Sequence, residues 1–538
     1  MFSNLSHRSS RSFFSILFLS LFIVACGSSS NDESPIIQLN GEPKIDLFLK
    51  DSYIEQGATA IDKDGVSLEV QISGIVNTDI AGTYEVIYSA VDEFDNTSST
   101  KRIINIISKP FISTWGNISQ FVIEVEGAGY NYSVDWGDGN VDQNIKGSIT
   151  HRYEGLDNYT ISLNGEFPNL KSIIGGCGRL RSIDQWGDIK WRSMYGAFEE
   201  CFHFDIEAID APDLALVTDM SRMFANVALA NADGIDNLNL WNVSTVENMN
   251  SMFFEADFVA DISNWDVSSV KDMGKMFYKS VYFNRDISNW DVSSVINMSG
   301  MFYLATSFNQ DIGNWDTSSV VNMEKMFYSS RNFNQNINNW NVSSVTNMSY
   351  MFSNALDYNH EMNNWDVSSV SNMSGMFHLA TSFNQDISSW DVSSVIDMSG
   401  MFWAAKIFDQ PLNKWDVSAV IDMSGVFAST GSFNQPLNNW DVSSVTDMGN
   451  MFAAASRFNQ NLADWDVTSV KDMRNMLAGV WFSRTRYDAL LQSWSMQNLQ
   501  NDVEFDAGNT SYSIESQSAR DVLTGTYNWN IIDSGLAN

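Results

Sequence analysis

The sequence predicts β-sandwich modules followed by an α/β solenoid, in which each rung of about 25 residues supplies a short strand and a short helix. Two observations support this fold class. Between Ile36 and Asn169, short β-rich runs alternate with turn signals, which is typical of small β-sandwiches. From Trp241 to Trp465, a tryptophan recurs every 24 or 25 residues, and such a period indicates stacked repeats.

The chain begins with a predicted export signal. Arg8 and Arg11 precede an apolar run from Phe13 to Ala25, which is too short to span a bilayer comfortably as a helix. The run ends in IVAC and is followed by GSSSNDES, which resembles the lipobox of bacterial lipoproteins. The resemblance implies cleavage before Cys26 and attachment of lipid to its sulfur. An ordinary signal peptide with an incidental cysteine is the alternative.

These features predict residues 1–25 as a lipoprotein signal peptide and residues 26–35 as the lipidated cysteine and a linker. The mature protein would then be exported, anchored to a bacterial membrane through lipid and exposed at the surface. If the organism has an outer membrane, we expect the anchor there.

Residues 36–108 resemble the bacterial Ig-like modules of surface proteins. The segment AGTYEVIYSAVDEFDN carries the resemblance, and KRIINII follows it as a closing strand. The resemblance implies a β-sandwich of roughly seven strands.

Residues 109–169 contain YSVDWGDGN and ITHRYEGLDNYTISL, which resemble a PKD-type β-sandwich. Within the first motif, Asp135 and Asp138 suit either a turn or calcium binding, and turn chemistry is the ordinary role of Asp and Gly there. Both sandwich modules are interpreted as spacers.

The repeats keep the same apolar residues at the same positions. Counted from each tryptophan, Val stands at +5, Met at +8, Met at +11 and Phe at +12, with Val426 and Leu477 as exceptions. This spacing covers one arc of a helix, and the apolar residues at −7 and −3 share the parity of a strand face. Each repeat therefore predicts a strand, a corner and a short helical turn, whose apolar face is buried only when repeats stack.

Two polar columns run through the array. An Asp or Asn follows each tryptophan, and it is interpreted as a turn cap, with a calcium ladder as the alternative. An Asn column from Asn284 to Asn459 is interpreted as a stacked asparagine ladder.

The near-consensus FNQDISNWDVSSVTNMSGMF resembles the tandem surface-protein repeats of bacterial lipoproteins, which are related to BspA-type leucine-rich repeats. The resemblance covers roughly residues 193–477 and implies a leucine-rich-repeat-like α/β solenoid that takes part in adhesion and protein binding without a shared catalytic site. Residues 170–480 are predicted to be the solenoid with its N-terminal cap, and residues 481–538 its C-terminal cap.

Cys177 and Cys201 lie one period apart in the first rungs, so they are a candidate disulfide between adjacent coils. Two buried free thiols are the alternative.

One variable column, directly after the Met-Phe pair, is aromatic in its first part. It predicts a ligand-binding stripe suited to stacking on sugars or gripping a peptide, whereas rings that only cover the edge of the core are the alternative. The stripe comprises Phe254, Tyr278, Tyr303, Tyr328, His378 and Trp403.

The sequence offers no enzyme motif, no metal-binding His pair and no cofactor signature. A net charge of −35 disfavours nucleic acid as a partner. We therefore predict a non-enzymatic surface lipoprotein whose repeats bind an unknown protein or glycan. A carbohydrate-binding protein that uses the aromatic stripe and a passive structural envelope protein are the alternatives.

Overall fold

The structure is a computed structural model that describes residues 33–171, 177–202, 204–227, 236–257 and 260–537. The chain divides into two compact units, one up to Ile107 and one from Ser108 onward. In the described ranges, no helix has the length and apolar character needed to cross a membrane. The predicted signal peptide and Cys26 lie outside the described residues.

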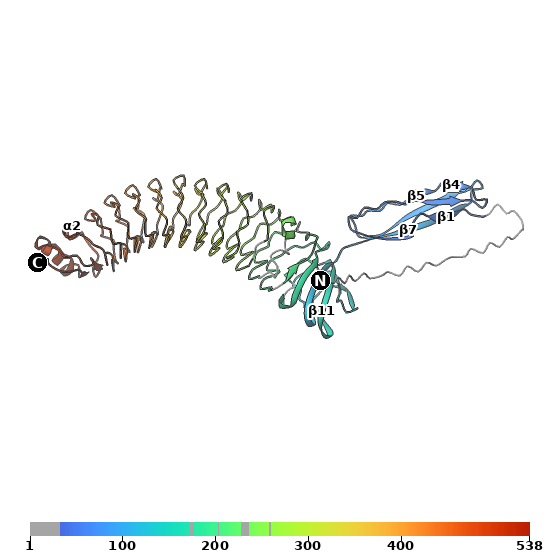
Figure 1. The fold of residues 1–538 in the computed structure, drawn as a ribbon, viewed down its shortest axis with the longest axis horizontal. Coiled ribbons are helices and arrows are strands. Elements are labelled where there is room, and N and C mark those ends of the chain that lie inside the picture. The colour runs from blue at the N-terminus through green and yellow to red at the C-terminus, as the bar shows by residue number, and fades with distance from the viewer. Residues whose placement is uncertain (1–32, 172–176, 203, 228–235, 258–259, 538) are drawn as a thin grey trace, which may run out of the picture. The chain divides into compact units, whose positions relative to one another are not determined.

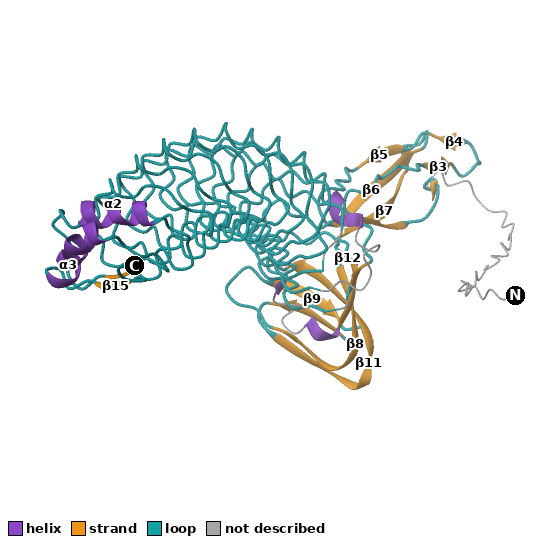
Figure 2. Ribbon diagram, turned by 60° about the vertical axis from the view of Figure 1, so that its left-hand side comes forward, coloured by secondary structure: helices purple, strands orange, loops and turns teal. Residues whose placement is uncertain are grey.

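The first unit consists of two β-sheets (Figures 1 and 2). One sheet has the order β1 (Ile36–Leu39), β3 (Ala58–Ile61), β4 (Ser67–Leu68). The other has the order β2 (Lys44–Phe48), β7 (Thr97–Ile107), β6 (Gly82–Val91), β5 (Gln71–Ser73). Alternate residues of β6 and β7, including Tyr88 and Ile104, point into a small core, as expected for strands with one buried face.

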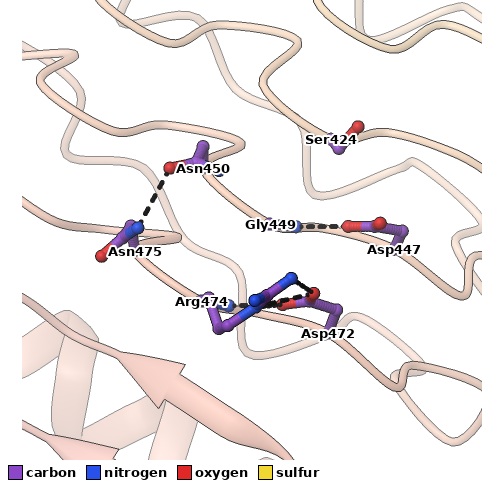
Figure 3. Close-up of a pocket in the computed structure, with 7 residues that line it drawn as sticks. All are labelled: Ser424, Asp447, Gly449, Asn450, Asp472, Arg474 and Asn475. Atoms are coloured by element: carbon purple, nitrogen blue, oxygen red, sulfur yellow. Dashed lines mark hydrogen bonds and ion pairs between the residues drawn. The ribbon is translucent and has the colours of Figure 1, made fainter.

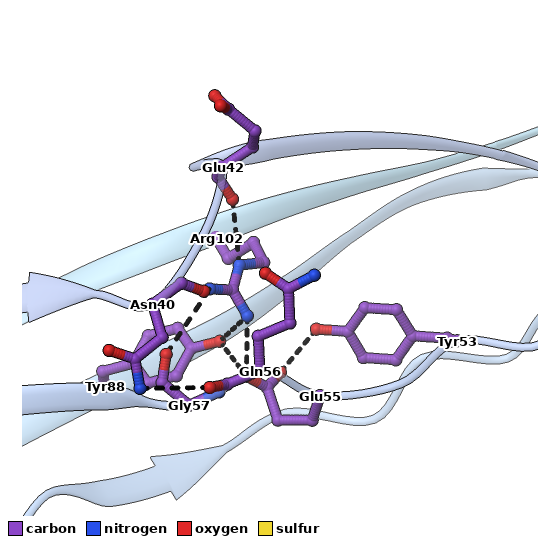
Figure 4. Close-up of polar contacts among 8 residues, drawn as sticks. All are labelled: Asn40, Glu42, Tyr53, Glu55, Gln56, Gly57, Tyr88 and Arg102. Atoms are coloured by element: carbon purple, nitrogen blue, oxygen red, sulfur yellow. Dashed lines mark hydrogen bonds and ion pairs between the residues drawn. The ribbon is translucent and has the colours of Figure 1, made fainter.

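A buried arginine joins the strands of this unit to a loop (Figure 4). The Arg102 side chain is fully buried and donates to Glu55 Oε1 and to the Tyr88 hydroxyl, both at 2.7 Å. It also donates to the carbonyl oxygens of Asn40 at 2.6 Å and Glu42 at 3.0 Å. Every charge in the network has a partner, so this arginine fixes the loop to β7 without an unpaired buried group.

The second unit begins with a six-stranded sheet (Figure 2). Its order is β10 (Val141–Ile145), β9 (Asn131–Asp135), β11 (Ile149–Glu166), β8 (Phe111–Ile123), β12 (Leu180–Gln185), β13 (Asp205–Ile206). Asp135 and Asp138 each accept a backbone N–H two residues ahead, from Gly137 and Asn140, at 3.0 Å, which is turn chemistry. The sheet continues into the predicted repeat segment, and the PKD-like identity of residues 109–169 stays a prediction.

Cys177, in the 3₁₀ turn η1 (Cys177–Arg179), and Cys201 are joined by a disulfide in this structure. Their Cα atoms are 5.2 Å apart.

The repeats stack in parallel, one period above another, and each 25-residue repeat is called a coil below. Single parallel β-bridges join the residue at +7 of each coil to its equivalent in the next. They run in an unbroken series from Asn248 to Asp472, and Figure 1 shows the coils following one another in a row.

The prediction of a leucine-rich-repeat-like α/β solenoid, with a strand and a helix in every rung, is wrong. The described residues of the second unit contain mainly β-strands as regular structure, with two short α-helices, α2 (Arg484–Trp494) and α3 (Gln517–Gly525), both after the repeats. The coils themselves are built of turns and single bridges.

Hydrogen bonding explains why no helix forms. Met373 donates its N–H to the carbonyl of Asp397 in the next coil at 2.9 Å, whereas Met376 donates to Met373 in its own coil at 3.2 Å. Residues at +10 and +14, such as Gly375 and Leu379, have positive φ, which interrupts right-handed helix. Successive three-residue turns place apolar residues at nearly the same spacing as a helix, so the periodicity did not distinguish the two.

From Trp265 onward, each repeat tryptophan fulfils a polar as well as an apolar role. The indole N–H of Trp390 donates to the carbonyl of Met362 in the preceding coil at 2.9 Å, and this bond recurs at 2.7–3.3 Å from Trp265 to Trp494. The +12 phenylalanines stack ring on ring along the array, with centroids 5.7 Å apart for Phe377 and Phe402. The indole gives the buried carbonyl of the preceding coil a donor that phenylalanine lacks, and this favours tryptophan at the position.

The two polar columns form different hydrogen bonds: the Asp or Asn after each tryptophan caps a turn in its own coil, and the Asn column links successive coils as a ladder. Asp391 accepts the backbone N–H of Ser393 at 3.1 Å and its hydroxyl at 2.6 Å. Because of these hydrogen bonds, the pKa of the Asp391 carboxyl lies below its usual value. Asn309 donates its N–H to Asn284 Oδ1 at 2.9 Å, and the bond repeats in the following coils.

The C-terminal segment after the repeats continues the parallel stacking, since Met473 of the last coil forms a parallel bridge with Phe505. β14 (Glu504–Asp506) follows α2, the 3₁₀ turn η4 (Ile514–Ser516) precedes α3, and β15 (Asn530–Ile532) pairs in parallel with β14. The helix α2 buries Tyr487, Leu490, Leu491 and Trp494 against the end of the core.

Candidate functional site

The predicted stripe residues lie side by side on the repeat array. Each follows a buried Met-Phe pair and precedes a residue with positive φ, so the turn at the end of this pair projects the same side chain in every coil. Phe254, Tyr278, Tyr303 and Tyr328 are half-buried. Their rings are nearly parallel, with centroids 4.6, 4.3 and 4.6 Å apart in order along the array.

The +13 column has serine, not an aromatic residue, at Ser353, between Tyr328 and His378. In the structure the ring of Tyr350, which the sequence analysis did not select, lies between those two side chains. Tyr350 stands at +10 rather than +13, and its ring centroid lies 6.5 Å from Tyr328 and 6.5 Å from His378. His378 in turn lies 5.9 Å from Trp403. The seven rings therefore form one continuous series across seven coils, named the aromatic row here: Phe254, Tyr278, Tyr303, Tyr328, Tyr350, His378 and Trp403.

Glycines in the following coil make room for two of these rings. A Cβ on Gly375 would lie 2.3 Å from Cε1 of Tyr350, and a Cβ on Gly425 would lie 2.8 Å from Cε3 of Trp403. An aromatic residue followed 25 residues later by glycine at +10 is the sequence signal that could have found Tyr350. Trp403 is the most open of the rings, with 40% of its surface exposed.

Lysines accompany the row. Lys279 lies 5.6 Å from the centroid of the Tyr278 ring and Lys325 lies 5.8 Å from that of Tyr350, within the range of cation–π attraction. Lys279 also bonds to Glu255 at 2.6 Å, and this bond raises the pKa of its ammonium group. Burial raises the pKa of the Tyr303 hydroxyl, with a further contribution from Tyr278, so this hydroxyl stays neutral.

The stacking limits what the first part of the row can bind. Rings 4.3–4.6 Å apart and nearly parallel cover one another's faces, so Phe254 to Tyr328 leave mainly ring edges, and the three tyrosines their hydroxyls, uncovered. Face stacking on a sugar needs an open ring face, whereas a protein surface uses edges, hydroxyls and cations. In the parts of the chain that the structure describes, no three His, Cys, Asp or Glu side chains cluster as a metal site would.

Comparison with known families confirms the prediction of a bacterial Ig-like domain. Residues 37–106 match the family described as "Bacterial surface protein, Ig-like domain". No curated protein matches the chain.

One solved structure with partial similarity is the crystal structure of the lipoprotein BT2262 from Bacteroides thetaiotaomicron. The match has 19% identity and a TM-score of 0.13, and it covers 22% of this chain and 54% of that one. The chain thus spans about half the length of that structure, and a score this low carries no argument about function or fold.

The repeats match a family described as "Mycoplasma protein of unknown function, DUF285", in overlapping copies. The matched ranges are 192–312, 229–340, 256–362, 329–431 and 404–515. Together with the Ig-like match, these repeats support a bacterial surface protein. Because the matches to the repeat family cover more than half of the chain, the protein belongs to that family.

Proposed function

We propose that the protein is a non-enzymatic bacterial surface lipoprotein, anchored through Cys26, whose repeat array binds a macromolecular partner through the aromatic row. The observation that carries the proposal is the continuity of seven partly exposed rings over seven coils, six from the variable +13 column and Tyr350 from +10. The other recurring ring columns, such as Phe377 and Trp390, are fully enclosed in the core.

A protein partner fits the row better than a sugar does over most of its length. Tyrosine edges with hydroxyls and nearby lysines offer apolar area, hydrogen bonds and positive charge together, which is the composition of binding hot spots. The rest of the surface is acidic, since the chain carries 65 Asp and Glu against 30 Lys and Arg. Lys279 and Lys325 place ammonium donors beside the row, each paired with a glutamate, Glu255 at 2.6 Å and Glu324 at 2.5 Å.

The location of binding is tested with two soluble proteins. Residues 27–538 keep every described residue, and residues 27–107 keep the first compact unit with its own core. Both are titrated against a panel of purified extracellular matrix and cell-surface proteins by surface plasmon resonance. Binding by the longer protein alone supports the proposal, and equal binding by both places the function in the Ig-like unit and contradicts it.

A further inference from the structure

Beyond the aromatic row, we propose a second binding site, for a neutral sugar residue of a glycan, in a polar pocket of the last coils of the repeat array (Figure 3). The cavity has a volume of about 240 Å³. Its lining comes from three successive coils: Ser424, Asp447, Gly449, Asn450, Asp472, Arg474 and Asn475.

One lining residue of the pocket is a glycine at a position where most coils carry a larger residue. Position +9 carries serine in the three preceding coils, at Ser374, Ser399 and Ser424, but it carries glycine at Gly449. A Cβ there would lie 3.1 Å from Asp447 Oδ1 and 3.5 Å from Asp472 Oδ1, so a side chain at this position would crowd both carboxylates of the pocket. Gly449 also lies where the aromatic row has ended, since the +13 column continues beyond Trp403 with alanine.

Some polar atoms of the lining side chains are hydrogen-bonded within the protein, and others have no partner in the described part of the protein and could bond to a ligand. Asp447 Oδ1 accepts the N–H of Gly449 at 2.8 Å, and Arg474 donates to both oxygens of Asp472 at 2.9–3.0 Å through Nε. Asn475 Nδ2 donates to Asn450 Oδ1 at 3.2 Å. Among the residues that the structure describes, none bonds to Asp447 Oδ2, Asn450 Nδ2 or Asn475 Oδ1. Two acceptors and one donor therefore remain within one small space.

The charges of Asp447, Asp472 and Arg474 disfavour both divalent cations and anions as ligands of the pocket. Arg474 neutralises Asp472, so a divalent cation would have to displace a guanidinium to gain a second carboxylate. An anion would meet the Asp447 carboxylate, whose pKa burial and the neighbouring Asp422 and Asp472 raise. A hydroxylated neutral ligand avoids both conflicts, because each hydroxyl donates and accepts and so matches carboxylate and amide groups together.

An aromatic platform stands close to this pocket. The Trp403 ring rests over Gly425, which follows the lining residue Ser424 and donates its N–H to the carbonyl of Gly449 at 2.8 Å. Trp403 is 40% exposed, unlike the mutually covered rings earlier in the row. Trp403 is not a lining residue, but its open face next to Gly425 offers an apolar surface for the C–H groups of a sugar that extends beyond the pocket.

The test uses residues 27–538 on an array of neutral, amino-sugar and sialylated oligosaccharides, followed by calorimetric titration of the strongest neutral binder. Gly449→Ser installs the residue of the three preceding coils and crowds both carboxylates, and Asn475→Ala removes an acceptor. Each is expected to weaken glycan binding at least about tenfold, the order that one lost polar contact costs. Circular dichroism at the temperature of the titration checks that each variant is folded, since Asn475 has a positive φ and a bond to Asn450. The matched control is Gly274→Ser, the same change at the same position of an earlier coil, which is expected to leave the affinity within about twofold.

Four results would overturn the proposal: no neutral oligosaccharide binds, Gly449→Ser binds as the unchanged protein does, only amine-bearing glycans bind, or calcium binds to the pocket in place of sugar. Tyr303→Ser separates this site from the aromatic row. It should leave the glycan affinity unchanged, and a loss there would move the sugar to the row and exclude the pocket. Protein binding by the row and sugar binding by the pocket can thus fail independently.

Discussion

At the scale of single residues, each repeated side chain satisfies a need that recurs in every coil. The tryptophan fills the core and bonds through its indole N–H to the preceding coil, as Trp390 does to Met362. The aspartate after it closes a turn through the N–H and hydroxyl of the serine two residues on. The sequence alone showed which columns were apolar, but not that the indole N–H was the reason for tryptophan.

Trp390→Phe is expected to destabilise the array by about 2–4 kcal/mol, since it removes the shorter of the two bonds to the Met362 carbonyl, which keeps only the Trp365 N–H at 3.3 Å, and opens a cavity. Urea unfolding followed by circular dichroism measures this. Trp241→Phe is the control, because the buried Trp241 indole N–H has no partner among the described residues. A loss at Trp241 as large as that at Trp390 would contradict the role assigned to the bond.

The Asp447 carboxyl predicts a pH dependence. Burial, and then Asp422 and Asp472, raise its pKa in the fold, while Arg474 opposes them. A carboxyl whose folded pKa lies above the unfolded one favours folding below the unfolded pKa, and this contribution is lost as pH rises through the folded pKa. Asp447→Asn, which copies Asn347 and Asn372 at the same position, should therefore raise the melting temperature at pH 7.

At about pH 3, below the usual range of aspartate, that gain should disappear because the carboxyl is protonated in both states. Differential scanning calorimetry at both pH values measures the difference. An equal gain at the two pH values would mean that the charge of Asp447 is not its source.

At the scale of elements, the sequence predicted the period and the core columns but not the conformation between them. Val at +5, Met at +8 and Met at +11 are three residues apart, and a series of tight turns satisfies that spacing as well as a helix does. The deciding features are the positive φ values at +10 and +14, where Lys325 and Ser329 show that non-glycine residues adopt them as well. The residue types at +10 and +14 therefore did not indicate the positive φ values that exclude a helix.

The same limit explains the incomplete prediction of the aromatic row. Column +13 was found because most of its members are aromatic, whereas Tyr350 belongs to another column and joins the row only through the folding of the turn. The sequence predicted the stripe as a set of separate rings, and contact between the rings depends on the distance between coils. That distance follows from the backbone bonds between coils.

Gly375 tests the seating of Tyr350. Gly375→Ala adds a Cβ 2.3 Å from the tyrosine ring at a φ of +58°, so it is expected to cost about 1–3 kcal/mol and to displace the ring. Gly400→Ala meets nothing closer than 3.9 Å at a φ of +60° and isolates the cost of the backbone conformation, about 1 kcal/mol. Thermal unfolding measures the loss of stability in both variants. Equal losses would show that the contact with the Tyr350 ring contributes nothing to the cost of Gly375→Ala.

At the scale of the whole molecule, the two proposed binding sites lie in the repeat array and not in the Ig-like unit. The Ig-like unit has its own core and its own family match, while the repeat array carries the aromatic row and the polar pocket. Stacked coils place variable positions in straight columns, so changes at one position of the repeat create a surface without disturbing the buried columns. The variable +13 column and the recurrent tryptophan column show this division within one repeat.

The most direct measurement replaces the centre of the row by the residue that the array already uses there. Tyr278→Ser, Tyr303→Ser and Tyr328→Ser are combined in residues 27–538, copying Ser353 in the same column, and binding to the partner protein is measured by surface plasmon resonance. Circular dichroism confirms that the variant is folded at the temperature of the assay. We predict a loss of affinity of at least about 100-fold, as expected for removal of several aromatic hot-spot residues. A folded variant that binds as tightly as the unchanged protein would contradict the assignment of the row as the contact surface.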